Sequence, residues 1–291
     1  MKKYSKDNIK KRGFLKALLV LLVVVAACAI ALVIYILVNK NIVVEKVDDS
    51  AKFISDDVAT NATPIVIDNV LIGGVYDKKW VGVEKFYMKS ANKSEQEIDV
   101  YNKTGKKGSY DLTAISQGDS TTVYSATTNT NLTDEYFAIV KNQSLNAMPI
   151  PATRKQTITD EEIKYVKKAL GMYKFLNTSI KITEVYNVVL SQGSNGMLIF
   201  ATNQAGKSLG VYSCVVYVDD LGKARLVKYN FLSDTNDASN WPVYSFKFTG
   251  DLNADGTSEV IIQEIKEFEV KYDVLEYRNN KFYEVLSTVI K

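Results

Sequence analysis

Histidine is absent from this 291-residue chain, and cysteine occurs only twice. Without histidine the chain cannot build a Ser/His or Cys/His nucleophile, a histidine general base or a histidine-ligated zinc site. Cys28 lies in an apolar run near the N-terminus, so Cys214 is the single cysteine beyond it and no disulfide can form within the rest of one chain. Cys214 also falls in an apolar stretch, and we expect it to be a small buried side chain.

Charged residues are missing from residues 17–38, a run made almost entirely of Leu, Val, Ile and Ala. A helix of this length spans the ~30 Å hydrocarbon core of a bilayer. The residues before it are strongly basic, and basic flanks stay on the cytoplasmic side of a membrane. We therefore predict a cytoplasmic tail at residues 1–13, a transmembrane anchor at residues 14–38 and an extracytoplasmic location for everything that follows.

Two alternatives to a retained anchor stay open. A cleaved signal peptide has an apolar stretch of about 7–15 residues and a small-residue cleavage site. Here the apolar run is longer, and no such site precedes Asn39. The sequence Val25-Ala26-Ala27-Cys28 loosely matches a lipobox, but the ten residues that follow Cys28 are apolar. The favoured interpretation is a single-pass protein of the cell membrane.

Beyond the anchor the sequence also lacks the excess of basic residues that nucleic-acid binding requires. The whole chain has a net charge of +3, but residues 1–38 hold seven basic side chains and one acidic side chain, a net of +6. Residues 39–291 therefore carry −3 and offer no basic surface for nucleic acid. The anchor, the lack of disulfides and the many Lys, Asn and Ile residues are typical of a bacterial envelope protein.

Beyond the anchor, the sequence predicts a polar stalk and two modules. The stalk covers residues 39–62 and includes a short helix over residues 42–58. A β-rich module at residues 63–150 follows it. The sequence Pro149-Ile150-Pro151 marks the boundary with a second module at residues 151–291, which combines one helix with a β-meander.

Alternation of β-branched residues between turn residues predicts antiparallel strands in both modules. In the first module we expect strands at Pro64–Ile72, Trp80–Met88, Glu97–Asn102, Ser109–Ile115, Ser120–Thr128 and Glu135–Lys141, with a turn at Gly73-Gly74. In the second module we expect them at Ile180–Leu190, Met197–Thr202, Val211–Val218, Ala224–Phe231, Val243–Phe248, Glu259–Ile265, Lys271–Arg278 and Lys281–Thr288. The predicted fold class is an N-terminal transmembrane helix followed by a mainly-β ectodomain of antiparallel meanders with one amphipathic helix.

The amphipathic helix is predicted to begin after Thr159. Thr159 and Glu162 have the spacing of a capping box. Four residues that follow, Ile163, Val166, Leu170 and Tyr173, fall on one face of a helix. This face is expected to dock against a sheet.

Residues 250–259, GDLNADGTSE, carry side chains with hard oxygen atoms at a regular spacing. Counted from Asp251 as position 1, these oxygens fall at positions 1, 3, 5 and 9, with a glycine at position 6. An EF-hand also needs a glutamate at position 12 and helical flanks. Position 12 is Ile262, inside a β-branched run, so the pattern favours a loop between two strands.

The sequence GDLNADGTSEVII resembles the calcium loop of FG-GAP and VCBS-type repeats, in which D-x-[DN]-x-D-G-x-x-[DE] joins two strands of a propeller blade. The resemblance implies the side-chain ligands Asp251, Asn253, Asp255 and Glu259, with the Thr257 carbonyl as a fifth. It covers only the C-terminal part of the chain, in one copy, and the Phe-Gly and Gly-Ala-Pro pair of the family is missing upstream. It therefore implies one blade-like meander with calcium as a structural cofactor. The alternative is an Asx-rich turn that binds nothing.

Two weaker motifs have simpler interpretations. The sequence YVDD at residues 217–220 matches the metal-binding hairpin of template-directed polymerases, but a hairpin turn with a left-handed Gly222 explains it as well. The sequence AGKS at residues 205–208 lacks the first glycine of a phosphate loop and is expected to be a turn.

Aromatic residues are common, with 18 tyrosines in the chain. Exposed Trp and Tyr can stack on sugars or anchor a protein partner, and Trp80 and Trp241 are candidates. Alternation at Tyr244, Phe246 and Phe248 instead predicts a core face, and packing is the favoured role.

The favoured function is a non-enzymatic envelope module that binds an envelope protein or polymer, or has a structural role. A tail of about a dozen residues is too short for a signalling domain. The alternative is an extracytoplasmic cell-wall hydrolase with Asp/Glu chemistry. Its candidate carboxylates are Glu264, Glu267 and Glu269, although the lysines among them favour a solvated strand face.

Overall fold

The computed structural model describes residues 44–46, 62–68, 70–83, 96–102, 105–117, 124–128, 137–140, 148–149, 152–171, 180–191, 194–203, 211–232 and 242–290. The chain divides into two units, Met1–Ile42 and Val43–Lys291. The predicted tail at 1–13 and anchor at 14–38 lie outside the described residues. Within the described part, no helix has both the length and the apolar character that crossing a bilayer requires.

The described residues of the second unit form three sheets, and their strands are antiparallel except where β1 runs parallel to β18. We call the first the helix-bearing sheet; its strands are β10 (Thr153–Arg154), β11 (Ile180–Ser191), β12 (Ser194–Asn203), β13 (Val211–Asp219) and β14 (Ala224–Leu232). The second, the C-terminal sheet, has the order β1 (Val44–Lys46), β18 (Lys281–Ile290), β17 (Glu269–Arg278), β16 (Glu259–Lys266), β15 (Val243–Asp251) and β9 (Met148–Pro149). The mainly antiparallel prediction is confirmed.

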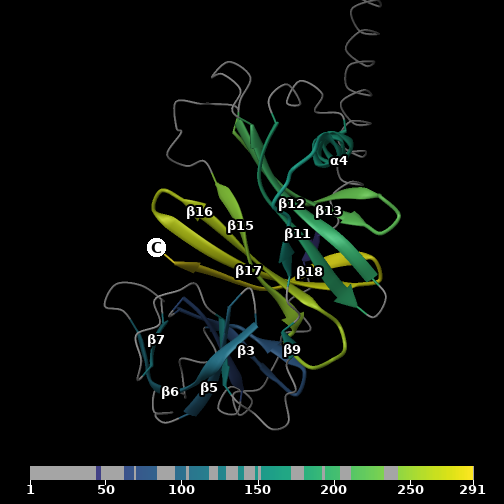
Figure 1. Cartoon of the computed structure of the whole chain (residues 1–291). Helices are drawn as coiled ribbons and strands as arrows, with labels where there is room; N and C mark the ends of the chain where they lie inside the picture. The colour runs from purple at the N-terminus through teal and green to yellow at the C-terminus, as the bar shows by residue number, and fades with distance from the viewer. Residues whose placement is uncertain are drawn as a thin grey trace, which may run out of the picture. The chain divides into compact units, whose positions relative to one another are not determined.

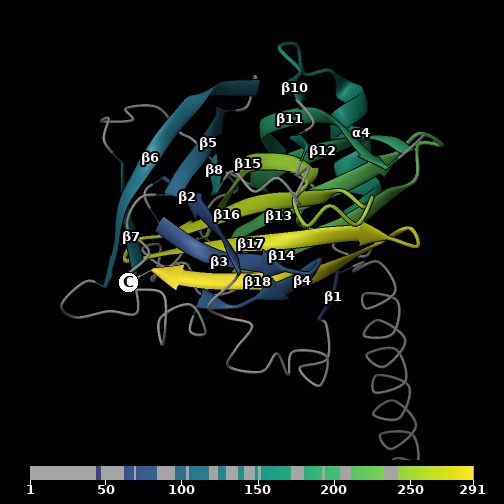
Figure 2. The ribbon, with the colours of Figure 1, turned by 90° about the horizontal axis from the view of Figure 1, so that it is seen from below.

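The third sheet closes on itself, and we call it the ring. Its order is β2 (Thr63–Ile67), β8 (Phe137–Val140), β5 (Gln96–Asn102), β6 (Gly105–Gln117), β7 (Tyr124–Thr128), β3 (Val70–Tyr76) and β4 (Lys79–Val81). An additional pairing of β2 with β3 completes the closure and leaves β4 as an extension. Figure 2 shows the ring from below, with β5, β6 and β8 on one side and β3 and β4 on the other.

Helix α4 (Asp160–Leu170) begins where the capping box predicts. Thr159 Oγ1 accepts the Glu161 N–H (3.3 Å), and Glu162 Oε2 accepts the Thr159 N–H (2.7 Å). Lys155 Nζ also contacts Glu162 Oε1. Burial alone would raise the pKa of Glu162, but the hydrogen bonds from Lys155 and Thr159 lower it to about 2. The helix is therefore fixed to the chain that enters it.

Three apolar clusters bind these elements into layers. Val166 and Leu170 of α4 pack on one face of the helix-bearing sheet, where Cys214 is fully buried as predicted. The other face of this sheet packs on the C-terminal sheet through residues such as Phe200 and Phe246. The far face of the C-terminal sheet packs on the ring. The C-terminal sheet is therefore the central layer, as Figure 1 shows between α4 and the ring.

The sequence-predicted boundary near residue 150 falls between β9 and β10, and so between two of the sheets. The residues on its two sides nevertheless share one core, because Ile65 and Ile72 of the ring pack with Ile261 and Val274 of the C-terminal sheet. Contacts also place all of Val43–Lys291 in one compact unit.

Three predictions of where helices, strands and turns lie are wrong. Val44–Lys46, inside the predicted short helix over 42–58, form a strand that pairs with β18. The predicted strand Pro64–Ile72 is a hairpin of two strands, because Asp68 takes a left-handed φ of 48° and turns the chain. Gly73 lies inside β3 instead of at a turn. A Cβ on Gly73 would meet the Val81 carbonyl oxygen at 2.7 Å, so close packing explains this glycine.

Alternation from Tyr244 to Phe248 is broken by a β-bulge. Register shifts between Phe246 and Phe248, which pair with Ile262 and Ile261. Tyr244 and Phe246 therefore join the cluster toward the helix-bearing sheet, while Phe248 joins the cluster toward the ring. All three rings are buried as predicted, but the prediction of one shared face is wrong for Phe248.

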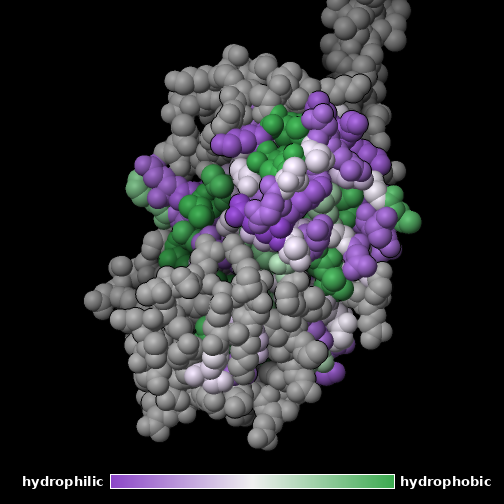
Figure 3. Space-filling model, in the orientation of Figure 1, coloured by the Kyte–Doolittle hydropathy of each residue, from purple (hydrophilic) through white to green (hydrophobic). Residues whose placement is uncertain are grey.

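One end of the C-terminal sheet carries an apolar row. Val243 pairs with Ile265, Ile265 with Val270, and Val270 with Ile290, so the row crosses four strands. Val243 and Ile265 are exposed, and so is Phe268 in the adjoining β16–β17 turn. Figure 3 shows hydrophobic atoms gathered over the region that β15 and β16 occupy in Figure 1.

Candidate functional site: an acidic loop between β15 and β16

The loop predicted to bind calcium connects two strands of the C-terminal sheet. Asp251 ends β15 and Glu259 begins β16, so both flanks are strands as the sequence predicts. Gly250 pairs with Glu259 at the base of the loop. Left-handed backbone at Ala254 (φ 58°) and Gly256 (φ 89°) reverses the chain between them. No heavy atom lies within 4 Å of a Cβ built on Gly256, so its φ, not crowding, explains this glycine.

Short hydrogen bonds to the backbone hold the loop. Asp251 Oδ1 accepts the Asp255 N–H (3.1 Å), and Asp251 Oδ2 accepts the Gly256 N–H (3.0 Å). Asp255 Oδ1 accepts the Thr257 N–H (2.7 Å), and Asn253 Oδ1 accepts the Asp255 N–H (3.1 Å). These bonds are those of an Asx-rich turn, and they turn carboxylate and amide oxygens toward backbone N–H groups of the loop.

Glu259 differs from the other acids of the loop because it is fully buried, at 0% exposure. Its Oε2 accepts the Leu252 N–H (2.6 Å), which directs the carboxylate into the loop. Its Oε1 is buried and has no hydrogen-bond partner among the residues that the structure describes. Burial raises the pKa of Glu259 well above its usual value, and the charges of Asp255 and Asp251 raise it further.

A second buried acid lies beside Glu259. Glu276 in β17 is its cross-strand partner and is also buried. Burial raises the pKa of Glu276, as does the charge of Asp255, while Arg278 acts in the opposite direction. Arg278 lies 3.2 Å from Glu276, but its side chain is 46% exposed. The acids around the loop therefore have little positive charge to balance them.

The donor atoms suit a hard cation. Calcium takes six to eight oxygen ligands from carboxylates, amides and carbonyls, and Asp251, Asn253, Asp255, Thr257 and Glu259 offer all three kinds. Across the described ranges, no three acidic, cysteine or histidine side chains already stand in a metal-holding group. The reason is that Asp251 and Asp255 are turned toward the N–H groups of the loop itself. An ion would have to draw these carboxylates inward.

The YVDD sequence forms the predicted hairpin turn. Gly222 has the left-handed φ of 71° expected for it, and its N–H donates to the Asp219 carbonyl (2.9 Å). The Asp219 carboxylate accepts the Lys223 N–H (2.8 Å) and an Arg225 N–H (3.0 Å). This carboxylate is therefore balanced by its own hairpin. The AGKS sequence at 205–208 lies outside the described residues.

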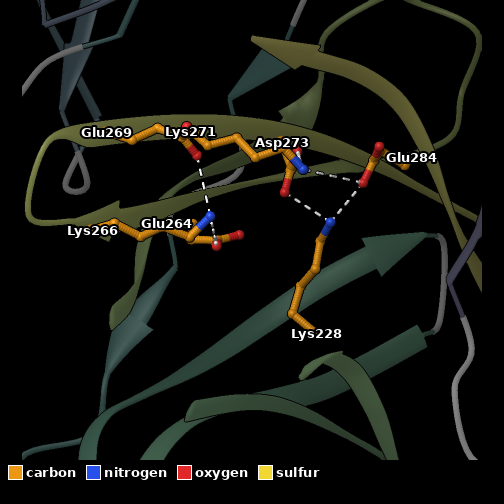
Figure 4. A network of polar contacts seen from close by, with 7 residues as sticks. All are labelled: Lys228, Glu264, Lys266, Glu269, Lys271, Asp273 and Glu284. Atoms are coloured by element: carbon orange, nitrogen blue, oxygen red, sulfur yellow. Dashed lines mark hydrogen bonds and ion pairs between the residues drawn. The ribbon is translucent and has the colours of Figure 1, made fainter. Parts of the chain in front are cut away.

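Two of the three glutamates considered for hydrolysis are held by one lysine. Lys266 Nζ lies 3.2 Å from Glu264 Oε1 and 3.2 Å from Glu269 Oε1, as Figure 4 shows. Glu267 is exposed in the β16–β17 turn. Of the aromatic candidates, Trp80 packs against the cluster between the C-terminal sheet and the ring, and Trp241 lies outside the described residues.

The sequence did not predict a network of ion pairs on the C-terminal sheet. Lys228 of β14 reaches across from the helix-bearing sheet to Asp273 (2.8 Å) and Glu284 (2.6 Å), and Lys271 lies 2.8 Å from Asp273 (Figure 4). The only sequence signal is the charges at alternate positions of β17, which place Lys271 and Asp273 on one face. Their partner Lys228 lies on another sheet, and strand patterning alone does not reveal that contact.

No protein-family model, curated protein or solved structure matches the chain. The likeness of residues 250–262 to FG-GAP and VCBS-type loops therefore rests on these residues alone.

Proposed function

We propose that this chain is a single-pass, membrane-anchored extracytoplasmic protein of the bacterial envelope, without catalytic activity, whose 251–259 loop is braced by calcium. In this proposal the mainly-β unit binds or supports an envelope protein or polymer. The apolar run at 17–38 and the basic residues before it support the anchor. Calcium serves as a structural cofactor with the ligands Asp251, Asn253, Asp255, Thr257 and Glu259.

The observation that carries the calcium proposal is the buried Glu259 carboxylate. One of its oxygens bonds to the loop, and the other has no hydrogen-bond partner among the described residues. A buried carboxylate without compensation costs several kcal/mol, so such groups are normally paired, protonated or bound to a metal. Asp251 and Asp255 lie in the same loop and supply further oxygens, which favours a cation over a shared proton.

Burial favours a binding or structural role over the hydrolase. Three acids at the loop have a raised pKa, and burial is the main cause for each. Glu259 and Glu276 are buried and cannot contact a polymer chain from outside, and the half-buried Asp251 carboxylate is hydrogen-bonded to the N–H groups of Asp255 and Gly256. Glu264 and Glu269 both form an ion pair with the Lys266 ammonium group, so neither carboxylate is free to act on a substrate without giving up that contact.

Thermal unfolding of the full chain in detergent micelles tests the calcium proposal. At about 10 mM calcium, a site with a Kd near 10⁻⁴–10⁻³ M stabilises the folded state by about 1.4–2.7 kcal/mol, which raises Tm by several degrees over chelator. The Asp255→Ala variant is expected to lose this rise. The matched control Asp219→Ala removes an acid from the turn between β13 and β14, and this variant is expected to keep the calcium-induced rise in Tm. If calcium leaves the wild-type melt unchanged, the loop is only a turn.

A further inference from the structure

The acidic loop also touches the ring. Asn253 is almost fully buried, and its Nδ2 donates to the Lys78 carbonyl oxygen (3.3 Å) in the β3–β4 turn. Asp77 and Lys78 both have left-handed φ, 47° and 62°, so the turn is tight and its carbonyl groups have fixed directions. Residues 175 positions apart in the chain are thereby joined at one point.

The Asn253 side chain takes part both in the acidic loop and in its contact with the β3–β4 turn. Asn253 Oδ1 accepts the Asp255 N–H inside the loop, while Nδ2 donates to Asp255 Oδ2 (3.1 Å) as well as to Lys78. The next residue inward, Leu252, is fully buried in the cluster that contains Ile72 and Val75 of the ring. If the loop becomes more rigid, Leu252 and Asn253 therefore become more rigid with it, and these are the residues that contact β3 and the β3–β4 turn.

We propose that the loop and the β3–β4 turn form a cation-operated clasp, in which an ion bound by the loop fixes Asn253 and so holds the Lys78 carbonyl against the C-terminal sheet. The inference rests on the proposed binding of calcium at this loop. The second observation behind the site is the buried Glu259 carboxylate, whose Oε2 accepts the Leu252 N–H of the loop and whose Oε1 has no hydrogen-bond partner among the described residues. Coordination of Asn253 through Oδ1 would leave Nδ2 directed at the ring.

Asparagine, rather than aspartate, is what makes the clasp. Either residue supplies an oxygen ligand at this position of the loop. Only asparagine also offers an N–H donor, because an ionised carboxylate can only accept and would face the Lys78 carbonyl with like partial charge. The Asn253→Asp substitution therefore separates ion binding from contact with the ring.

Other contacts between the ring and the C-terminal sheet do not involve the loop. Thr288 Oγ1 donates to the Ile72 carbonyl (2.8 Å), and Lys247 lies 3.0 Å from Asp68. These contacts and the shared apolar cluster hold the ring with or without an ion. The clasp is consequently expected to act locally, on β3, β4 and the turn between them.

Hydrogen–deuterium exchange of the full chain in micelles, with calcium and with chelator, tests the clasp. Stabilisation of the β3–β4 turn by the equivalent of one hydrogen bond makes its opening about 3- to 10-fold less frequent. We therefore expect backbone N–H exchange to slow by this factor in peptides that contain Lys79–Val81. Helix α4, on the far side of the helix-bearing sheet, is the internal control and is expected to exchange equally in both conditions.

Calorimetric titration with calcium chloride accompanies the exchange experiment. Asn253→Asp is expected to bind calcium at least as tightly as wild type but to lose the slowing at Lys79–Val81. Glu259→Gln is expected to lose binding and slowing together. If α4 exchanges faster in Asn253→Asp, the fold is disturbed and Asn253→Ser replaces it, since serine offers an oxygen but is too short to reach Lys78.

The outcomes separate the two proposals. If wild type binds calcium but exchange at Lys79–Val81 is unchanged, or if Asn253→Asp keeps the slowing, the clasp is wrong and the calcium site stands. If wild type does not bind calcium, the proposed site and the clasp both fail.

Discussion

Two fully buried carboxylates of the C-terminal sheet, Asp273 and Glu259, differ in how their charge is balanced. Burial would raise the pKa of Asp273, but Lys228 and Lys271 lower it below its usual value. Burial raises the pKa of Glu259, and its charged neighbours are acids that raise it further. The two groups are equally buried and lie on adjacent strands. The fold itself supplies a cation to Asp273, whereas the calcium proposed at Glu259 would come from solution.

The largest effect is expected where the chain supplies the cation. Lys228→Met removes the ammonium group by which the helix-bearing sheet contacts Asp273 and Glu284 of the C-terminal sheet. Breaking a buried ion pair from one side is expected to cost about 3 kcal/mol in free energy of unfolding, measured in urea.

The double variant Lys228→Met/Asp273→Leu separates charge from packing. It also removes the Asp273 carboxylate, which the single variant leaves buried without Lys228. We expect the double variant to recover most of the lost stability. A double variant as unstable as Lys228→Met would show that packing at Lys228, not the charge of Asp273, explains the loss.

Glu259→Gln is expected to behave in the opposite way. In chelator, a neutral side chain of the same shape removes an unbalanced buried charge, so the free energy of unfolding stays equal or rises. In about 10 mM calcium, the variant is expected to lack the gain of about 1.4–2.7 kcal/mol predicted for wild type. A clear loss of stability in chelator would mean that Glu259 is already balanced by the chain.

Glu162, a buried carboxylate of helix α4, provides a pH test. Its folded-state pKa of about 2 lies below its usual value of 4.5. Its contribution is therefore full above about pH 5 and is lost as pH falls toward 2. We expect Glu162→Gln to lower the free energy of unfolding by about 1–2 kcal/mol at pH 7 and by progressively less toward pH 3. A difference that is constant with pH would rule out the charge as its cause.

The smallest effect is expected at the other acidic turn. Asp219→Ala removes the bonds to the Lys223 N–H and to Arg225, at a cost of about 0.5–1 kcal/mol in urea unfolding. The calcium-induced rise in Tm is expected to match that of wild type. A smaller calcium-induced rise in Tm in this variant would contradict the expectation that calcium binds at the 251–259 loop and not at the Asp219 turn.

Local sequence patterns predicted most strands and the helix, because these elements depend on neighbours in the chain. The capping box at Thr159 and the strand from Val211 are found where alternation and turn residues place them. The errors arise where tertiary contacts override local signals. Gly73 reads as a turn residue but is required by close approach to Val81, and a bulge sends Phe248 to the opposite face from Phe246.

The candidate site was predictable in its residues but not in its charge balance. Spacing alone named the loop and its flanking strands. Spacing could not reveal that Glu259 is buried, that Glu276 is its cross-strand neighbour, or that Asn253 reaches the ring at Lys78. Each of these facts depends on strand register or on contact between sheets, which no short segment encodes.

Calorimetric titration of the full chain in micelles with calcium chloride, compared with Glu259→Gln, tests the central claim most directly. The claim predicts saturable binding of one calcium per chain to wild type with a Kd near 10⁻⁴–10⁻³ M, and loss of that binding in the variant. Equal binding by both proteins, or binding by neither, would contradict the claim that the unbalanced Glu259 carboxylate marks a cation site.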